Sequence, residues 1–379
     1  MKSSLAVLIF TAAATAWAGN PTRSGSAGAG ELLINPWARS AGWAEGNTAN
    51  VMGIESMYGN VAGLAGGKSF TAGFSNTTWL QGSGIKVNAA ALATPTRNGV
   101  LGIHVTNFDY GDIDVTTTAL PDGGAGIYSP GSSVLGIAYA QMFTDNIYGG
   151  VNIKLYSSSI SNLSANGMCF DAGVQYVAGK TRDFRFGITL RNIGPSFGYK
   201  GDGLAVVMPV DWGTYANTFN VRAQAFELPT QLAIGLSKDF SMPGKQKVTV
   251  AGNFISNSFK KDQFTVGGQY NFRDQFFVRG SYAFFDNRLD GLATEALSGP
   301  AMGFTFKTPM GATTKFALDY GYRLTNTAFG GFTVTGFCLD GGVFLAKEVD
   351  CRVDVAARFD QGFFAITKWR KGTVAKLLY

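Results

Sequence analysis

Apolar and polar side chains alternate along most of this chain. In one segment Phe316, Leu318 and Tyr320 stand at every second position, and Asp319 stands between the last two. Successive side chains of a β-strand point to opposite faces, so this spacing predicts a strand with one apolar and one polar face. The same pattern recurs from about residue 68 to about residue 344. At roughly 10 residues per strand it predicts an all-β fold, a transmembrane antiparallel β-barrel of about fourteen strands.

The connections between these strands alternate between short and long. The short set comprises 95–99, 144–146, 179–183, 242–247, 273–275 and 309–312. The longer set comprises 109–131, 157–165, 194–227, 286–299 and 325–331. Outer-membrane barrels combine tight periplasmic turns with longer extracellular loops. We therefore expect the short set, and both ends of an even-numbered barrel, on the periplasmic side.

One segment ahead of the strands, residues 35–65, does not alternate. Small residues fill it between a few bulky ones, and its spacing is helical only over 51–57. A long run of strands preceded by one irregular segment suggests a barrel that closes around that segment. We call residues 35–65 the hatch and expect it to fold into the lumen. Its candidate luminal residues are Trp37, Arg39, Trp43, Glu45 and Asn60.

The charges of the hatch allow two interpretations. If Arg39 and Glu45 are buried in the lumen, they should pair with inward residues such as Asp319 or Arg279, because burying an unpaired charge costs several kcal/mol. Alternatively, they face water in the mouth of the barrel. The two tryptophans are expected to pack the hatch and not to form a ligand platform.

Composition supports a sheet with one face in lipid. Charged residues make up 15 % of the chain, against about 25 % in an average soluble domain. Glycine accounts for 51 of 379 residues, and phenylalanine for 30. No window after the first 18 residues approaches the roughly 18 apolar residues of a spanning helix. The net charge of +6 is spread along the chain, so nucleic-acid binding has little support.

The start of the chain is typical of a secretion signal, with Lys2, a short apolar run at 5–15 and the cleavage site Ala16-Trp17-Ala18. Residues 19–30 are rich in Gly, Ser and Ala and are expected to form a flexible periplasmic lead. The N-terminus is therefore predicted to be periplasmic and the location the outer membrane of a Gram-negative bacterium. The expected organisation is signal peptide 1–18, lead and hatch 19–66, barrel 67–344 and tail 345–379.

The tail also alternates. A strand is predicted at 349–355, and a hairpin follows it to Tyr379. Either these strands raise the barrel to about sixteen, or 345–379 forms a small β-hairpin tail behind a fourteen-stranded barrel. The second interpretation is preferred.

Little in the chain indicates catalysis. His104 is the only histidine; it lies on the polar face of a predicted strand with no motif around it, which favours a hydrogen-bonding role in the lumen. Cys169, Cys338 and Cys351 have neither metal-ligand spacing nor a disulfide framework, although the last two could pair in the periplasm. We expect no enzyme activity, no cofactor and no metal site.

Two motifs in the hatch resemble the PorV/PorQ family of FadL-like outer-membrane barrels. Ala38-Arg39-Ser40-Ala41-Gly42 is similar to that family's Ala-Arg-x-x-Gly opening. Tyr58-Gly59-Asn60-Val61-Ala62-Gly63-Leu64-Ala65 is similar to its Tyr-x-Asn-Pro-Ala-Gly-Leu-Ala, with Val61 in place of the proline. The family's Met-Gly-Gly-Ala run is replaced by Trp43-Ala44-Glu45-Gly46. In the tail, Gly362-Phe363 followed by a Lys376-bearing strand is similar to the sorting signal of type IX cargo, although a plain terminal hairpin is the preferred interpretation.

The resemblance implies a fourteen-stranded barrel with an N-terminal hatch, embedded in outer-membrane lipid. PorV-type and PorQ-type members act in type IX protein secretion or surface attachment by binding cargo signals or partner proteins. FadL itself takes up hydrophobic small molecules. The expected function is thus a non-enzymatic secretion component, and the alternative is a FadL-like channel for hydrophobic solutes. A general porin is a third possibility, which a plugged lumen would disfavour.

Overall fold

The computed structural model describes residues 23–179, 181–209, 216–285, 296–310, 314–325 and 331–341. The predicted signal peptide, Cys351 and the predicted tail lie outside these ranges, so their interpretations remain predictions.

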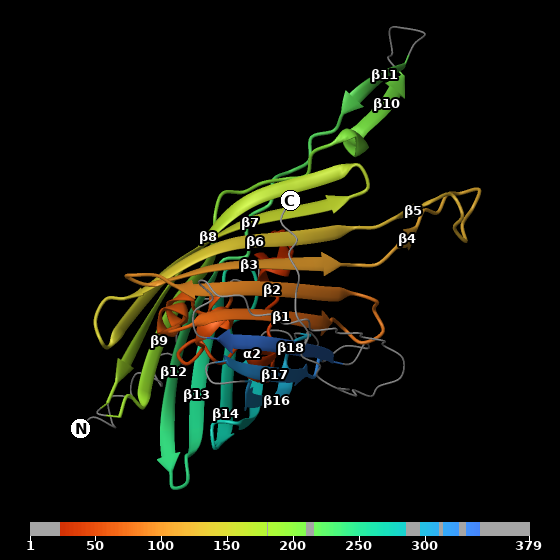
Figure 1. Ribbon diagram of the computed structural model, residues 1–379. Coiled ribbons are helices and arrows are strands. Elements are labelled where there is room, and N and C mark those ends of the chain that lie inside the picture. Colours follow the sequence, from red (N-terminus) through yellow and green to blue (C-terminus); the bar gives the residue numbers. More distant parts are fainter. Residues whose placement is uncertain are drawn as a thin grey trace, which may run out of the picture. The chain divides into compact units, whose positions relative to one another are not determined.

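Fourteen antiparallel strands close into a barrel, each paired with its neighbour along the chain, and β1 pairs with β18 to complete the ring (Figure 1). This confirms the predicted barrel, and closure does not require the strands of the sixteen-stranded alternative. The barrel strands are β1 (Phe70–Thr78), β2 (Lys86–Pro95), β3 (Val100–Asp109), β6 (Gly131–Met142), β7 (Ile147–Ile160), β8 (Leu163–Ala178), β9 (Phe184–Ile193), β12 (Gln231–Met242), β13 (Gln246–Asn257), β14 (Gln263–Phe272), β15 (Phe276–Phe285), β16 (Gly299–Pro309), β17 (Thr314–Arg323) and β18 (Phe332–Gly341).

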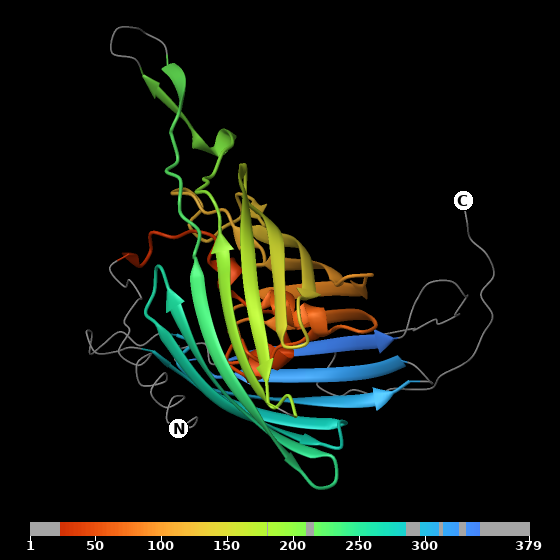
Figure 2. The ribbon, with the colours of Figure 1, turned by 90° about the vertical axis from the view of Figure 1, so that its left-hand side faces the viewer.

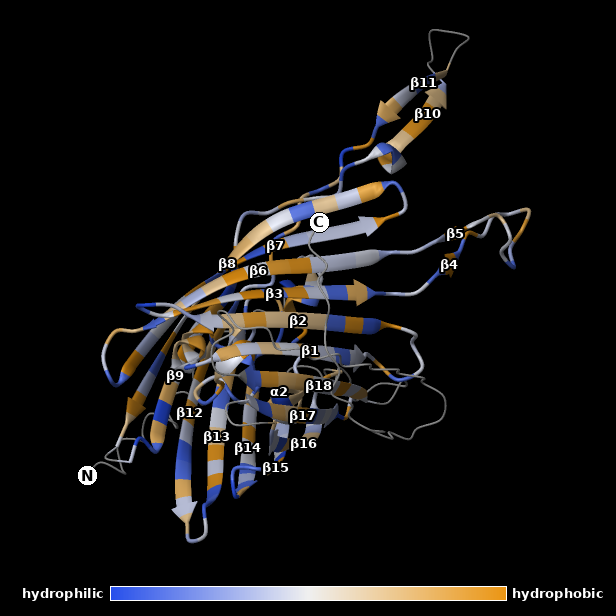
Figure 3. Cartoon of the chain, viewed as in Figure 1, coloured by the Kyte–Doolittle hydropathy of each residue, from blue (hydrophilic) through white to orange (hydrophobic). Residues whose placement is uncertain are grey.

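Hydrophobic and hydrophilic residues alternate along the strands, as the colours of Figure 3 show, and burial places the polar ones inside the barrel and the apolar ones outside. In β3, His104 is buried inside the barrel, whereas Leu101, Ile103 and Val105 are exposed on its outer surface. Large apolar side chains are exposed in the same way on nearly every strand. Such an exterior is the kind that hydrocarbon solvates, whereas in water contiguous apolar patches of this size are rare on monomers.

The two ends of the barrel differ in their connections. At the short-turn end the strands are joined by 96–99, 143–146, 179–183, 243–245, 273–275 and 310–313. At the long-loop end the connections are 79–85, 110–130, 161–162, 194–230, 258–262, 286–298 and 324–331. Two of them contain small ribbons, β4 (Ile113–Asp114) with β5 (Ile127–Tyr128), and β10 (Ala205–Pro209) with β11 (Ala216–Asn220).

One predicted loop is a strand pair instead. Residues 157–165 were expected to form a long connection because they are small and polar, but β7 and β8 extend through them and leave only 161–162 as the turn. The longer loop 194–230 supports this extension, because Ser164 bridges to Lys200 and the hydroxyls of Ser158 and Tyr199 lie 3.1 Å apart. The polar residues at the extended ends of β7 and β8 therefore bond to the 194–230 connection.

The hatch lies inside the ring of strands, where Figure 2 shows it in orange and red. It begins after the short 3-10 helix η2 (Gly30–Leu33) and contains α2 (Ala38–Gly42), η3 (Gly53–Met57) and η4 (Val61–Gly66). Helix α2 packs against β16 and β17, while η4 packs against β6, β7 and β8 on another side of the wall. Within the described ranges, no helix has the length and hydrophobicity needed to cross a membrane.

The lead differs from its expected position. It was placed with the short turns, yet Gly28 N donates to Glu227 O at 3.0 Å and Arg23 forms a 2.7 Å ion pair with Glu227. The Arg23 guanidinium also lies over the ring of Phe259, in the 258–262 connection. Residues 23–30 therefore lie at the long-loop end. The chain then descends through the lumen and reaches the short-turn end before β1 begins.

Candidate functional site

Glycines on the inner wall make room for the hatch backbone. A Cβ atom on Gly321 of β17 would lie 2.4 Å from the carbonyl oxygen of Ala38, and one on Gly187 of β9 would lie 2.6 Å from that of Thr48. Neither carbonyl can move without moving the hatch. Part of the high glycine content therefore has a local cause, namely close approach between two backbones.

Arg39 attaches the hatch to the wall through a buried carboxylate. Its Nε donates to Asp319 Oδ1 at 3.0 Å and its Nη2 donates to Asp319 Oδ2 at 2.9 Å. Glu55 of η3 lies on the other side, with Oε1 3.4 Å from Arg39 Nε, and accepts a hydrogen bond from Ser40. Burial alone would lower the pKa of Arg39, but the carboxylates of Asp319 and Glu55 outweigh it and raise that pKa above its ordinary value. Burial raises the pKa of Glu55, although Arg39 opposes it.

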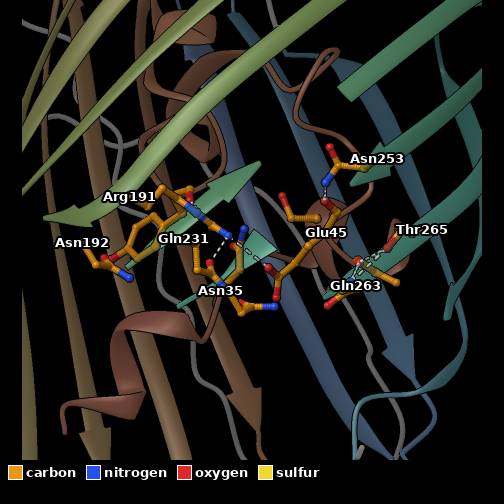
Figure 4. Close-up of polar contacts among 12 residues, drawn as sticks. Asn35, Glu45, Arg191, Asn192, Gln231, Asn253, Gln263 and Thr265 are labelled. Carbon is orange, nitrogen blue, oxygen red and sulfur yellow. Dashed lines mark hydrogen bonds and ion pairs between the residues drawn. The ribbon is translucent and has the colours of Figure 1, made fainter. Parts of the chain in front are cut away.

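Glu45 lies among polar side chains of the wall, including Arg191 and Asn253, as Figure 4 shows. Its backbone has a left-handed φ of 63°, and its carbonyl oxygen accepts a hydrogen bond from Asn253 Nδ2 at 3.0 Å. Its carboxylate lies 3.5 Å from Arg191 Nη2 and 3.8 Å from Arg323 Nη1. The pairing with wall cations was one of the two interpretations of the sequence, but the partners are Arg191 and Arg323. Arg279 instead donates from Nε to Gln269 at 3.1 Å.

A bulge in β9 turns Asn192 into the lumen beside Arg191. Pairing with β8 passes from Ala172↔Leu190 to Phe170↔Ile193, so β9 holds one extra residue. Arg191 and Asn192 consequently both face inward, and Asn192 adopts a φ of 60°. Strict alternation predicts only one of them in the lumen, so the sequence pattern misses Asn192. Asparagine tolerates the left-handed region better than most residues, which is the available signal for such a bulge.

Asn60 joins three segments at the centre of the lumen. Its Nδ2 donates to Thr48 O and Val174 O, both at 3.1 Å, and its Oδ1 accepts from the backbone nitrogen of Ala62 at 3.2 Å. The second interaction crosses from the hatch to β8, and the third caps η4. The side chain is fully buried. Its amide therefore supplies hydrogen bonds that the irregular backbone cannot make for itself.

The tryptophans of the hatch are packed against the wall. Trp37 and Trp43 are both buried, and Trp37 meets Tyr58 edge-on with ring centroids 6.4 Å apart. A Cβ on Gly267 of β14 would lie 2.9 Å from the Trp43 ring. The absence of a side chain at Gly267 therefore leaves room for the indole. Trp37 Nε1 has no hydrogen-bond partner.

His104 belongs to a buried hydrogen-bonded group. Its Nδ1 lies 2.9 Å from the Tyr58 hydroxyl, and its Nε2 faces the Asn152 side chain, whose Nδ2 also donates to Met57 O at 3.1 Å. Asn152 further donates to Asp171, which pairs with Lys154 at 2.8 Å. Among the residues that the structure describes, the hydrogen-bond partners of this imidazole are Tyr58 and Asn152, and neither is a serine or a cysteine. Across the described ranges, no three His, Cys, Asp or Glu side chains converge as metal ligands.

Glu31 was not singled out from the sequence, yet it anchors the end of the lead. The Tyr110 hydroxyl donates to its Oε1 at 2.6 Å, and the Tyr156 hydroxyl donates to its Oε2 at 3.1 Å. Burial and the neighbouring carboxylate raise the pKa of Tyr110, which keeps its hydroxyl a donor. The tyrosines stand 79 and 125 residues away in the chain, so no local pattern connects them to Glu31.

Beside Glu31 lies an apolar region that we call the vestibule. Leu32 and Ile34 occupy it, next to the hatch on the long-loop side. Its wall is built from Val87, Phe108, Val134, Tyr156, Cys169 and Leu228, with Trp79, Tyr110, Phe197 and Phe226 packed around them. Apolar packing therefore continues from the hatch, where Trp37, Met57 and Leu64 contact the wall, to the long-loop end of the lumen.

The chain matches no protein-family model and no curated protein. It does match solved structures. The Ralstonia pickettii toluene transporter TbuX aligns at a TM-score of 0.50 and 11 % identity, over 81 % of this chain and 97 % of its own. CymD, a monoaromatic hydrocarbon channel, aligns at 0.50 and 12 %, over 82 % and 98 %. A Pseudomonas aeruginosa FadL homologue aligns at 0.43 and 11 %, over 79 % and 96 %. The first two likenesses show a shared fold, a closed outer-membrane-type β-barrel, in agreement with the barrel expected from the sequence.

Proposed function

We propose that this protein is an outer-membrane channel of the FadL-like type, which carries hydrophobic small molecules without catalysing a reaction. The observation that carries the proposal is a closed barrel whose bore is filled by a hatch and whose long-loop end is apolar. Its fold is that of TbuX and CymD, whose names describe hydrocarbon transport. This proposal favours the alternative function over the type IX secretion role expected first.

The exterior supports the membrane location. Rows of exposed Phe, Tyr, Leu, Ile and Val surround the barrel, and outer-membrane barrels present such a band to lipid. By the same rule the short turns are periplasmic and the long loops extracellular. The lead, with Arg23 and Glu31, would then lie on the extracellular side, and the hatch would descend from there toward the periplasm.

The plugged bore argues against a general porin. An open porin passes hydrophilic solutes through a water-filled lumen, whereas here α2, η3 and η4 pack against several strands at once. The apolar packing of the vestibule lies at the end of the lumen where a sparingly soluble molecule would arrive from outside. That first binding step does not require a route past the ion pairs and hydrogen bonds that join the hatch to the wall.

The test is uptake by cells. A Gram-negative host that lacks its own hydrocarbon channel would express the full chain and receive radiolabelled toluene or, separately, a hydrophilic sugar of similar size. We expect faster initial uptake of toluene than in cells with an empty vector, with sugar uptake unchanged. Equal acceleration of both solutes would indicate a porin, and acceleration of neither would refute the channel.

One observation favours a second candidate, the protein-partner role implied by the resemblance to PorV and PorQ. The β10–β11 ribbon exposes an apolar face, formed by Val206, Met208, Phe219 and Val221. Exposed apolar patches mark protein interfaces. Affinity purification from detergent-solubilised outer membrane distinguishes the two. Recovery of type IX components or cargo would support this candidate, provided that Phe219→Ser abolishes the recovery.

A further inference from the structure

A cavity of about 180 Å³ lies at the long-loop end, separate from the hatch. Three segments line it, namely the lead with η2, the start of β12 and the end of β13 with its following loop. Leu33, Pro229 and Phe259 contribute apolar side chains, while Gly25 and Gly30 contribute bare backbone. A Cβ added at Gly30 would meet no atom within 4 Å, so this glycine borders open space.

Two amide side chains in the wall, Gln231 and Asn257, are already bonded to each other. Gln231 accepts a hydrogen bond from Arg191 and donates from Nε2 to Asn257 Oδ1 at 2.6 Å. Asn257 in turn donates from Nδ2 to Lys261 O at 2.8 Å. Among the described residues, none of the buried polar atoms that lack a partner belongs to the lining. A guest therefore finds apolar surface and amide groups that are already hydrogen-bonded.

The ring of Phe259 is held in place from outside the cavity. The Arg23 guanidinium lies 4.4 Å from the centroid of this ring, and Arg23 is itself paired with Glu227. A buried aromatic ring with a fixed position offers an edge or face to a second ring, a contact worth about 0.5–1.5 kcal/mol beyond area burial. Lys260 is the one charged side chain in the lining, and it is exposed.

The volume limits the guest. An apolar cavity of about 150 Å³ accommodates benzene in another protein. A space of about 180 Å³ therefore fits one aromatic ring with a small substituent and cannot enclose a long acyl chain.

We propose that this cavity binds an uncharged apolar molecule the size of a single substituted aromatic ring. The inference deepens the proposed function, on which it rests, by assigning a first binding site and a size limit. The one cation among the described residues of the lining, Lys260, is exposed to water, where its attraction for a carboxylate is weak, so an aromatic acid of the same size should bind less well.

The test uses the purified full chain in lipid nanodiscs, with empty nanodiscs to subtract partition into lipid. Fluorobenzene and fluorobenzoate are titrated separately and followed by fluorine NMR. Gly30→Leu would fill the cavity, and Gly30 is not at a positive φ, so the backbone accepts the change. Gly280→Leu is the matched control, because Gly280 lies on β15 and a Cβ there would meet only Ala301 O, at 3.9 Å.

We expect saturable fluorobenzene binding, at least tenfold weaker in Gly30→Leu and unchanged in Gly280→Leu, with fluorobenzoate at least tenfold weaker than fluorobenzene. Equal binding by folded Gly30→Leu, or tighter binding of fluorobenzoate, would overturn the assignment. If Gly30→Leu does not fold, Leu33→Ala decides, because a larger cavity should gain affinity for fluoronaphthalene and no gain overturns the proposal. Ring binding without toluene uptake would refute the channel alone, whereas uptake without ring binding would refute the cavity alone.

Discussion

The Arg39–Asp319 pair should be the strongest single attachment of the hatch, and Asp319→Asn tests it. Asp319 is buried and receives the Arg39 guanidinium through three donor–acceptor contacts of 2.9–3.1 Å. Replacing the carboxylate by an amide leaves that cation without its main counter-charge. Removing one partner of a buried ion pair typically costs about 3–5 kcal/mol.

Two features reduce this cost. The Arg39 side chain keeps 25 % of its exposure to solvent, and Glu55 remains 3.4 Å away as a second partner. We therefore expect a loss of about 2–3 kcal/mol in the free energy that holds the hatch closed, which raises its opening constant about 30- to 150-fold. Wall strands distant from the hatch should be unaffected.

Hydrogen exchange of the α2 amides, measured by mass spectrometry on the purified barrel, reports this opening. Asp319→Asn, Arg39→Gln and the double variant form a cycle, in which the two losses should overlap by about 1–2 kcal/mol because they remove the same contact. Asp122→Asn, an exposed carboxylate in the 110–130 connection, controls for charge alone. Strictly additive effects, or unchanged exchange in α2, would refute the pairing as the anchor.

Three further changes probe other parts of the hatch. Because burial raises the pKa of Glu55, the folded protein binds that proton more tightly than the unfolded chain, so stability should fall as pH rises from about 4.5 through the raised pKa. Glu55→Gln should flatten this part of a plot of Tm against pH, and an unchanged slope would contradict the reasoning. Gly321→Ala should cost about 1–3 kcal/mol of unfolding free energy, because its Cβ meets the Ala38 carbonyl, while Gly280→Ala should be nearly neutral; equal denaturant midpoints for both would count against the glycine seat. Asn60→Asp should lower Tm more than Asn60→Ala, since a buried carboxylate would face Thr48 and Val174 carbonyls, and the reverse order would show that these donors are unimportant.

The wall could be predicted from the sequence because its period is simple. Alternation sets which residues face inward, so it places His104 and Asp319 in the lumen, where both are buried. That the strands close into a ring is not encoded by a separate motif; it is inferred from the number of strands and the lengths of the turns. The prediction of a long loop at 157–165 was wrong because small polar residues suit both a loop and the ends of two paired strands, here β7 and β8.

The contacts of the hatch were predictable only in kind. Two buried charges require partners, which indicates wall cations and carboxylates, but several inward arginines meet that requirement, and alternation does not say which of them Glu45 reaches. The position of the lead failed for a different reason. A Gly- and Ser-rich segment has no period, and its side of the barrel is decided by Glu31, whose tyrosine partners are remote in the chain.

Mutations should affect the Arg39–Asp319 attachment of the hatch and ligand binding in the apolar cavity independently of each other. Asp319 holds α2 against β17 in the middle of the lumen, whereas Gly30 borders a space between the lead, β12 and β13. Asp319→Asn should therefore speed exchange in α2 while leaving fluorobenzene affinity within about twofold, because distant sites without shared partners act independently. Gly30→Leu should weaken fluorobenzene binding and leave exchange in α2 unchanged.

Arg191 lies between the two regions, because it contacts both Glu45 of the hatch and Gln231 of the cavity wall. If Asp319→Asn weakens fluorobenzene binding as much as Gly30→Leu does, the two regions are coupled, and Arg191→Gln should then abolish that coupling.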